Sequence, residues 1–206
     1  FASELRAGSP KIVERPMRDW ITRGSQAYYE QLKRDHHVDE FNAIARRKVR
    51  TRRDYQQKRV AYLDFATRYP DSVLAPMAGN KAAEYVLKLG NTSQALSEFD
   101  GIESKRPVPY IVRWVKLGRA DALRQQGRWH EAAQAYHEIS HYPFPRQKYL
   151  DDINLSRLEC LIKAGDVLTA QQMFARFNDR VRTSGLKLSD KDQGRLMAIR
   201  SDIIPG

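Results

Sequence analysis

A short motif returns three times along the chain and constrains its fold more than any other feature. Each copy has a glycine, an alanine five residues later, an aromatic residue nine later and a bulky apolar residue twelve later. The copies start at Gly90, Gly127 and Gly165, which are 37 and 38 residues apart. The other members are Ala95, Phe99 and Ile102; Ala132, Tyr136 and Ile139; and Ala170, Phe174 and Phe177. A repeat of this length is typical of stacked helical hairpins.

Each position of the motif has a physical role in such a hairpin. Glycine adopts a left-handed conformation at no side-chain cost, so it can end the first helix. The alanine lets the second helix approach the first closely, and the aromatic ring fills the space between the helices. We find no segment with the period-two alternation of a strand. The sequence therefore predicts an all-α protein built from helix pairs.

The breaks between these pairs predict the order of the elements. An extended arm over 1–17 and a helix over 18–36 come first, and one long helix over 40–68 follows, because that stretch contains no glycine or proline. Helix pairs then cover 73–89 with 92–104, 109–126 with 128–140, and 146–164 with 166–184. A helix over 190–202 would cover the open end of the stack. The expected segments are an arm 1–17, a hairpin 18–72, three hairpins 73–184 and a capping helix with tail 185–206.

The chain is basic, with 36 Lys and Arg against 25 Asp and Glu and a net charge of +11. Such a charge favours nucleic acid, anionic lipid or acidic protein as a partner, and does not choose among them. No run approaches the roughly 18 apolar residues that a membrane helix needs. The single cysteine, Cys160, shares an apolar helical stripe with Ile153 and Leu158, so we expect it in the core.

Six of the eight residues 46–53 are basic and form a candidate docking patch. They are Arg46, Arg47, Lys48, Arg50, Arg52 and Arg53. On one continuous helix these side chains cannot share a face, so a merely solvated helix is one interpretation. Docking onto an acidic protein or lipid headgroups is a second. Phosphate contacts with nucleic acid, with Tyr55 stacking on a base, are a third, although no nucleic-acid recognition motif accompanies the patch.

The sequence offers no set of residues that would support catalysis or a cofactor. It contains no glycine-rich phosphate loop, no nucleophile elbow and no recognisable pair of catalytic carboxylates. His130, His137 and His141 could share a helix face, but His141 lies near the helix end before Pro143, where that face is lost. We therefore expect a protein that is not an enzyme and holds no metal or cofactor.

The motif resembles the tetratricopeptide repeat, in which glycine, alanine and an aromatic residue precede a later proline, as in Gly90, Ala95, Phe99 and Pro107. The junction from Tyr69 to Ser72, followed by Ala75 and Pro76, is similar to that of bacterial envelope proteins of the BamD and CpoB type. The resemblance covers roughly residues 50–180. Lys58 departs from it, because it stands where a small alanine is expected, and Arg119 stands where leucine is usual.

The resemblance implies an α-solenoid that scaffolds other proteins by gripping a peptide or domain in a concave groove. The first helix of each hairpin would line that groove, and its exposed residues would be Asn80, Glu84, Lys88, Trp114, Asp121, Arg124, Gln125, Asp152, Glu159 and Lys163. Trp114 is the expected anchor, since tryptophan is frequent at the centre of interfaces. The same positions could instead form a solvated helix face with no ligand.

The resemblance also implies a subunit of a bacterial cell-envelope complex, in the periplasm or at the periplasmic face of the outer membrane. The cytoplasm is the alternative location. A nucleic-acid-associated or anionic-surface-binding protein that uses the basic patch is the alternative function.

Overall fold

The computed structural model describes residue 28 and residues 30–105, 107–142, 144, 147–184 and 188–203. Throughout these residues the regular structure is helical, as the sequence predicts, and no strand occurs among them. The described helices are α3 (Val38–Arg46), α4 (Arg52–Arg68), α5 (Ala75–Lys88), α6 (Thr92–Ser104), α7 (Pro109–Gln125), α8 (Trp129–Ile139), α9 (Gln147–Lys163), α10 (Val167–Thr183) and α11 (Asp190–Ile203). Their order and bounds agree with the predicted helices from residue 73 onward.

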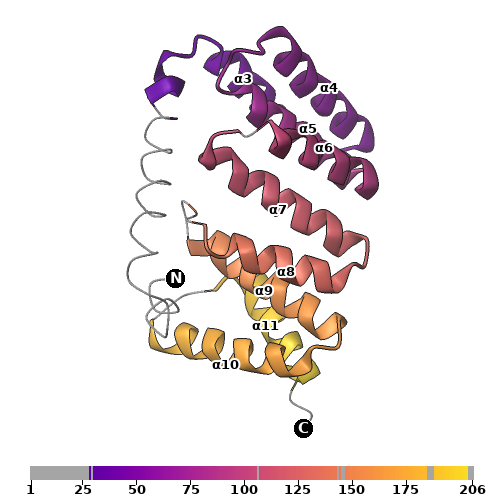
Figure 1. The fold of residues 1–206 in the computed structure, drawn as a ribbon, viewed down its shortest axis with the longest axis vertical. Coiled ribbons are helices and arrows are strands. Elements are labelled where there is room, and N and C mark those ends of the chain that lie inside the picture. The colour runs from indigo at the N-terminus through magenta and orange to yellow at the C-terminus, as the bar shows by residue number, and fades with distance from the viewer. Residues whose placement is uncertain are drawn as a thin grey trace. The chain divides into compact units, whose positions relative to one another are not determined.

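The chain forms two compact units, a first unit over residues 1–122 and a second unit over 123–206. In the first unit α4 packs against α3 and α5, and α5 packs against α6 (Figure 1). In the second unit α9 packs against α8, α10 and α11, and α10 also packs against α11. Elements that follow one another in the chain thus pack together, which is consistent with stacked hairpins.

The three glycine turns adopt the same backbone structure. Gly90, Gly127 and Gly165 have φ of 87°, 73° and 80°. In each turn the glycine N–H bonds to the carbonyl three residues back, at 3.0, 3.1 and 3.0 Å. The next residue donates to the carbonyl five residues back: Asn91 to Val86 at 3.2 Å, Arg128 to Leu123 at 3.1 Å and Asp166 to Leu161 at 3.0 Å. This pair of bonds is the Schellman motif, so the glycines end their helices as predicted.

The remaining positions of the motif are packed as their sizes predict. Ala95, Ala132 and Ala170 are each 0 % exposed, and the three aromatic residues that follow them are buried. The apolar residues at the twelfth position are buried at Ile139 and Phe177 and half-buried at Ile102. The small and large positions of the repeat therefore face the interior of their hairpins.

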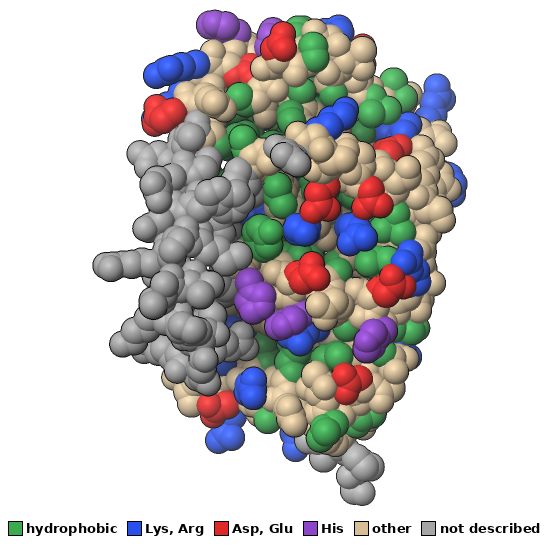
Figure 2. All heavy atoms as spheres, in the orientation of Figure 1, with side chains coloured by type: hydrophobic (Ala, Val, Ile, Leu, Met, Phe, Trp, Pro, Cys, Tyr) green, Lys and Arg blue, Asp and Glu red, His purple; other side chains and the backbone are tan. Residues whose placement is uncertain are grey.

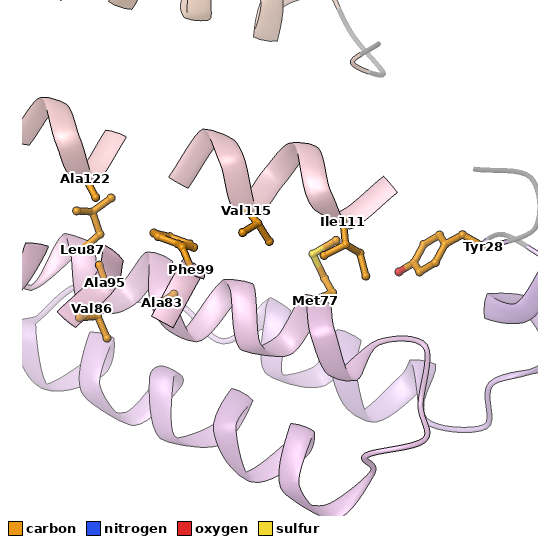
Figure 3. Packing of buried hydrophobic residues seen from close by; sticks show 10 residues of the cluster. All are labelled: Tyr28, Met77, Ala83, Val86, Leu87, Ala95, Phe99, Ile111, Val115 and Ala122. Atoms are coloured by element: carbon orange, nitrogen blue, oxygen red, sulfur yellow. The ribbon is translucent and has the colours of Figure 1, made fainter. Parts of the chain in front are cut away.

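The core of the first unit joins α5, α6 and α7. Figure 3 shows side chains of α5 and α6, among them Met77 and Phe99, facing Ile111 and Val115 of α7. A side chain at Gly118 would overlap the ring of Phe99, so α6 and α7 approach each other too closely for any residue with a Cβ atom there. This close approach binds α7 to the preceding hairpin.

The predicted long helix over 40–68 is wrong, because two helices occupy that stretch. The helix α3 ends at Arg46, residues 47–50 form a turn, and Thr51 is the N-cap of α4. The Thr51 hydroxyl accepts from the Asp54 N–H at 3.2 Å, and the Asp54 carboxylate accepts from the Thr51 N–H at 2.8 Å. These two bonds form a capping box, which starts a helix without any glycine or proline before it.

The helix α11 lies where the sequence predicts a capping helix. Ser189 begins it, since its hydroxyl accepts from the Asp192 N–H at 3.3 Å, and Ile203 at its end is buried. Residues 30–34 are helical, within the predicted helix 18–36. The predicted helix ends early, because residues 35 and 36 are described and are not helical. Residue 28 is helical, and residues 18–27 and 29 lie outside the described residues, as do the arm 1–17 and residues 204–206. No helix in the described part of the chain is long and apolar enough to cross a membrane.

Candidate functional site

The predicted basic patch forms a turn instead of a continuous helix. We define the basic turn as residues 46–53, which contain the last residue of α3, the connection 47–50 and the start of α4. Asp54 closes the turn, because one carboxylate oxygen accepts from the N–H groups of Arg50 at 2.9 Å and Thr51 at 2.8 Å. These backbone hydrogen bonds lower the pKa of Asp54. The half-buried Val49 packs against the core and anchors the connection.

All six basic side chains of the turn are exposed, and none forms an ion pair with another described residue. Elsewhere the charges are mixed, since acidic and basic side chains lie interspersed over the face seen in Figure 2. The patch is therefore an uncompensated cluster of cations.

A seventh cation lies beneath the turn. Lys58 of α4 is only 7 % exposed, and its ammonium group donates to the carbonyls of Ala45 at 2.7 Å and Arg47 at 2.8 Å. Burial lowers the pKa of Lys58, and the positive charges of Lys88, Arg47 and Lys81 lower it further. Through these two hydrogen bonds the Lys58 amine holds the end of α3 against α4.

The structure brings the basic turn next to the end of α5, a proximity that sequence spacing does not reveal. The Arg52 guanidinium donates to the carbonyl of Leu89, the residue after α5, at 3.4 Å. The amines of Lys58 and Lys88 both lie near the ring of Tyr85, 5.8 Å and 5.0 Å from its centroid. Two sets of predicted binding residues, the basic patch and Lys88, are thus neighbours.

The predicted groove residues of the first unit differ in exposure. Lys88 is exposed, whereas Glu84 and Asp121 are half-buried. Glu84 is bound by the Lys81 amine, 2.9 Å from each of its carboxylate oxygens. Asn80 contradicts the prediction of an exposed position, because it is 0 % exposed and donates to Glu84 at 2.9 Å. The burial arises because α5 packs against both α4 and α6.

The expected anchor Trp114 is half-buried and packs against the core cluster of the first unit. The Arg113 guanidinium lies 5.4 Å from its ring. The side chain therefore already contributes to the fold of the first unit.

Three of the predicted residues of the second unit form an ion-pair network with Arg195 of α11: Arg124, Asp152 and Glu159. Glu159 is bound by Arg124 at 3.2 Å and by Arg195 at 2.6 Å, and Arg195 also pairs with Asp152. Burial by itself lowers the pKa of Arg195, but hydrogen bonds and charge from Glu159 and Asp152 raise it above its usual range. Gln125 and Lys163 are exposed. The sequence does not reveal Arg195, because its partners lie 36 and 43 residues away.

The second unit also carries an apolar hollow between α10 and α11 that sequence analysis does not indicate. Its volume is about 560 Å³, and its lining includes Phe174, Val181, Leu196 and Met197. Met197 is 71 % exposed, which is unusual for a large apolar side chain. Asn178, Gln193 and Arg200 also line the hollow, so its surface is mainly apolar with a few polar groups.

The histidine group has one close pair. The rings of His137 and His141 lie 4.9 Å apart, and His130 is exposed. Within the described ranges, no three His, Cys, Asp or Glu side chains are grouped so that they could hold a metal ion. Cys160 is buried, as predicted.

Comparison with known proteins adds no assignment, since no family model, curated protein or solved structure matches this chain.

Proposed function

We propose that the protein is a tetratricopeptide-like α-solenoid that works as a non-enzymatic scaffold for other proteins. The observation that carries this proposal is the hairpin turn that recurs three times with one backbone structure and the same buried positions. Repeats of this kind bury their hydrophobic faces against their neighbours and present the remaining faces to partners. The sequence resemblance to envelope proteins of the BamD and CpoB type supports the further proposal that this role belongs to a bacterial cell-envelope complex, in the periplasm or at the outer membrane.

The partner would contact the first helices of the hairpins. Lys88, Gln125 and Lys163 lie on these helices and are exposed, so their side chains are available for hydrogen bonds with a peptide backbone. The half-buried Glu84 and Glu159 would contribute less, because ion pairs within the protein already hold them.

Site-specific photo-crosslinking in cells tests this function. A crosslinking amino acid replaces Lys88, Gln125 or Lys163 in separate variants, and matched controls carry it at exposed positions of the second helices: Ser97, Gln134 and Gln172. We expect one protein to be crosslinked from the first-helix positions and not from the controls. Equal crosslinking from both sets, or none from either, would contradict a specific protein-binding face.

The second candidate function is a nucleic-acid-associated or anionic-surface-binding protein. The six exposed cations of the basic turn favour it, since none of them is neutralised by a described carboxylate. Binding to a random DNA duplex that falls steeply with salt would support this candidate, and no binding at low salt would exclude nucleic acid.

A further inference from the structure

We propose that the basic turn and the end of α5 form one cationic surface that binds a carboxylate-rich segment of the protein partner. We call it the turn–α5 surface and define it by Arg46, Arg47, Lys48, Arg50, Arg52, Arg53 and Lys88. The two parts are joined by the Arg52 hydrogen bond to the Leu89 carbonyl and by Lys58, which lies between them. The proposal rests on the proposed scaffold function and specifies the chemistry of its partner.

The nearby carboxylates offset only a small part of this charge. Asp54 accepts from backbone N–H groups of the turn and its single negative charge acts on Arg50, while Glu84 is held by Lys81 and Asn80. No carboxylate of a described residue forms an ion pair with the turn or with Lys88. The counter-charge must therefore come from solvent ions or from a partner.

Lys58 strengthens the positive field from below. Its ammonium group is bound by carbonyl oxygens alone, which carry no net charge, and it stands close enough to Lys88 and Arg47 for their charges to affect it. Charges that are partly shielded from water interact more strongly than fully solvated ones. An anionic ligand on the turn–α5 surface would relieve this repulsion, so binding is favoured beyond the direct contacts.

The chemistry of the surface favours carboxylates on a short peptide. Five of the six basic residues in the turn are arginines, whose planar guanidinium groups bind carboxylates and phosphates alike through two parallel hydrogen bonds, so the size of the surface has to distinguish the two. The surface is one turn and one helix end, a footprint suited to a few acidic side chains rather than to a long duplex.

Two observations argue against the other anionic partners. Tyr55, the aromatic residue nearest the turn in sequence, is half-buried and packs against Tyr85 and the core cluster, with the two ring centroids 5.8 Å apart, so stacking on a base would compete with this packing. Val49, the apolar residue of the connection, is half-buried and cannot insert into a membrane as it lies.

Fluorescence anisotropy with a labelled peptide of alternating glutamate and serine tests the proposal on the full chain. The same peptide with glutamine in place of glutamate is the first control. The variant Arg47→Gln/Arg52→Gln/Lys88→Gln removes three charges from the surface, and Arg176→Gln/Arg182→Gln/Lys191→Gln removes three exposed charges from the second unit. Circular dichroism checks that both variants keep the helical content of the parent chain.

We expect the acidic peptide to bind and its affinity to fall by about tenfold or more in the first variant, against less than about twofold in the second. The proposal would be overturned if both variants bound the acidic peptide equally, or if the parent chain bound the glutamine peptide. It would also be overturned if the parent chain bound a 20-base-pair duplex or anionic phosphatidylserine vesicles more tightly than the acidic peptide. If the acidic peptide does not bind, while the crosslinking amino acid at position 88 still captures one protein in cells, only this inference fails. If the peptide binds but crosslinking finds no specific partner, the scaffold function fails instead.

Discussion

Lys58 in the first unit and Arg195 in the second are both largely withdrawn from solvent, and their surroundings satisfy the two charges in opposite ways. In the first unit the amine of Lys58 is bound by two backbone carbonyls, and neighbouring cations help to lower its pKa. In the second unit the guanidinium of Arg195 is bound by carboxylates of α9, and its pKa is raised. The hairpin turns are the same in both units, so this difference lies in the side chains and not in the backbone.

The contrast indicates different roles for the charges of the two units. In the second unit the network of Arg124, Arg195, Asp152 and Glu159 is neutralised internally and serves to hold α11 on α9. In the first unit Lys58 and the seven cations of the turn–α5 surface form no ion pair with a described carboxylate. A surface that leaves so much charge unpaired costs stability through repulsion, which a partner of opposite charge would offset.

The largest predicted effect comes from breaking the network of the second unit. Arg195→Met leaves Glu159 and Asp152 without their main cation, and Arg195 is largely buried, with 15 % of its side chain exposed. We expect the free energy of unfolding to fall by about 2 kcal/mol, less than for a fully buried pair, because Asp152 is exposed and Glu159 keeps its pairing with Arg124. Urea unfolding followed by circular dichroism measures the change.

Arg200→Met is the matched control, because Arg200 lies on the same helix, is exposed and has no ion pair among the described residues. Its free energy of unfolding should stay within about 0.5 kcal/mol of the parent chain. Equal losses from both substitutions would mean that the network does not hold α11, and the contrast between the units would disappear.

The next prediction compares packing at helical glycines in the two units. Gly118→Ala places a methyl group into the ring of Phe99 in the first unit, whereas Gly194→Ala in α11 meets no atom within 4 Å. Overpacking should outweigh the gain in helix propensity, so we expect Gly118→Ala to lower the free energy of unfolding by about 1–2 kcal/mol. Thermal unfolding of both variants provides the measurement.

Gly194→Ala should raise the free energy of unfolding by about 0.5–1 kcal/mol, because only helix propensity changes. Gly101→Ala in α6 is a further control within the first unit, since its new Cβ atom also meets nothing within 4 Å. If Gly118→Ala were as stabilising as Gly101→Ala, α6 and α7 could not be packed as closely as the structure shows.

The hairpin turns should respond alike in both units. Alanine at Gly90, Gly127 or Gly165 would be forced into a positive φ, and no neighbouring atom lies closer than 3.8 Å to the added Cβ atom in any of the three turns. We therefore expect each substitution to lower the free energy of unfolding by about 1 kcal/mol, through the backbone alone. Calorimetry of the three variants would show whether one turn departs from the others.

The repeated hairpins could be predicted from sequence because their signals are local. Glycine ends a helix within one turn, and the spacing of Ala95 and Phe99 already defines a packed face. The break in the predicted long helix was missed because it depends on a capping box. Thr51 and Asp54 have the spacing of that motif, and a search for it would have found the break.

The charged surfaces could not be predicted, because they depend on which residues meet in space. Asn80 occupies a position that the repeat register exposes, yet packing by two neighbouring helices buries it. The approach of Arg52 to Leu89 joins residues 37 apart in the chain, and the network of Arg195 spans a similar distance. Spacing along a helix carries no information about such contacts.

The smallest predicted effect comes from removing the buried cation of the first unit. Lys58→Met deletes two hydrogen bonds to carbonyls, but it also removes a charge that burial and neighbouring cations disfavour. These contributions oppose each other, so we expect the free energy of unfolding at neutral pH to change by less than about 1 kcal/mol. The result would sharpen the contrast with Arg195→Met, in which the deleted charge is favoured by its partners.

The pH dependence of Lys58→Met distinguishes this explanation from simple loss of packing. The pKa of Lys58 lies below its ordinary value of 10.5 in the folded chain, so the unfolded chain binds the proton more tightly. Its contribution to the free energy of unfolding therefore rises with pH through the interval below 10.5 and is absent in the methionine variant. Urea unfolding of both chains at neutral pH and at about pH 10 measures this effect. The free energy of unfolding of the parent chain, relative to that of Lys58→Met, should be larger at about pH 10 than at neutral pH. A constant difference between the two chains would mean that Lys58 is charged without penalty, and that the field beneath the basic turn is weaker than its neighbours imply.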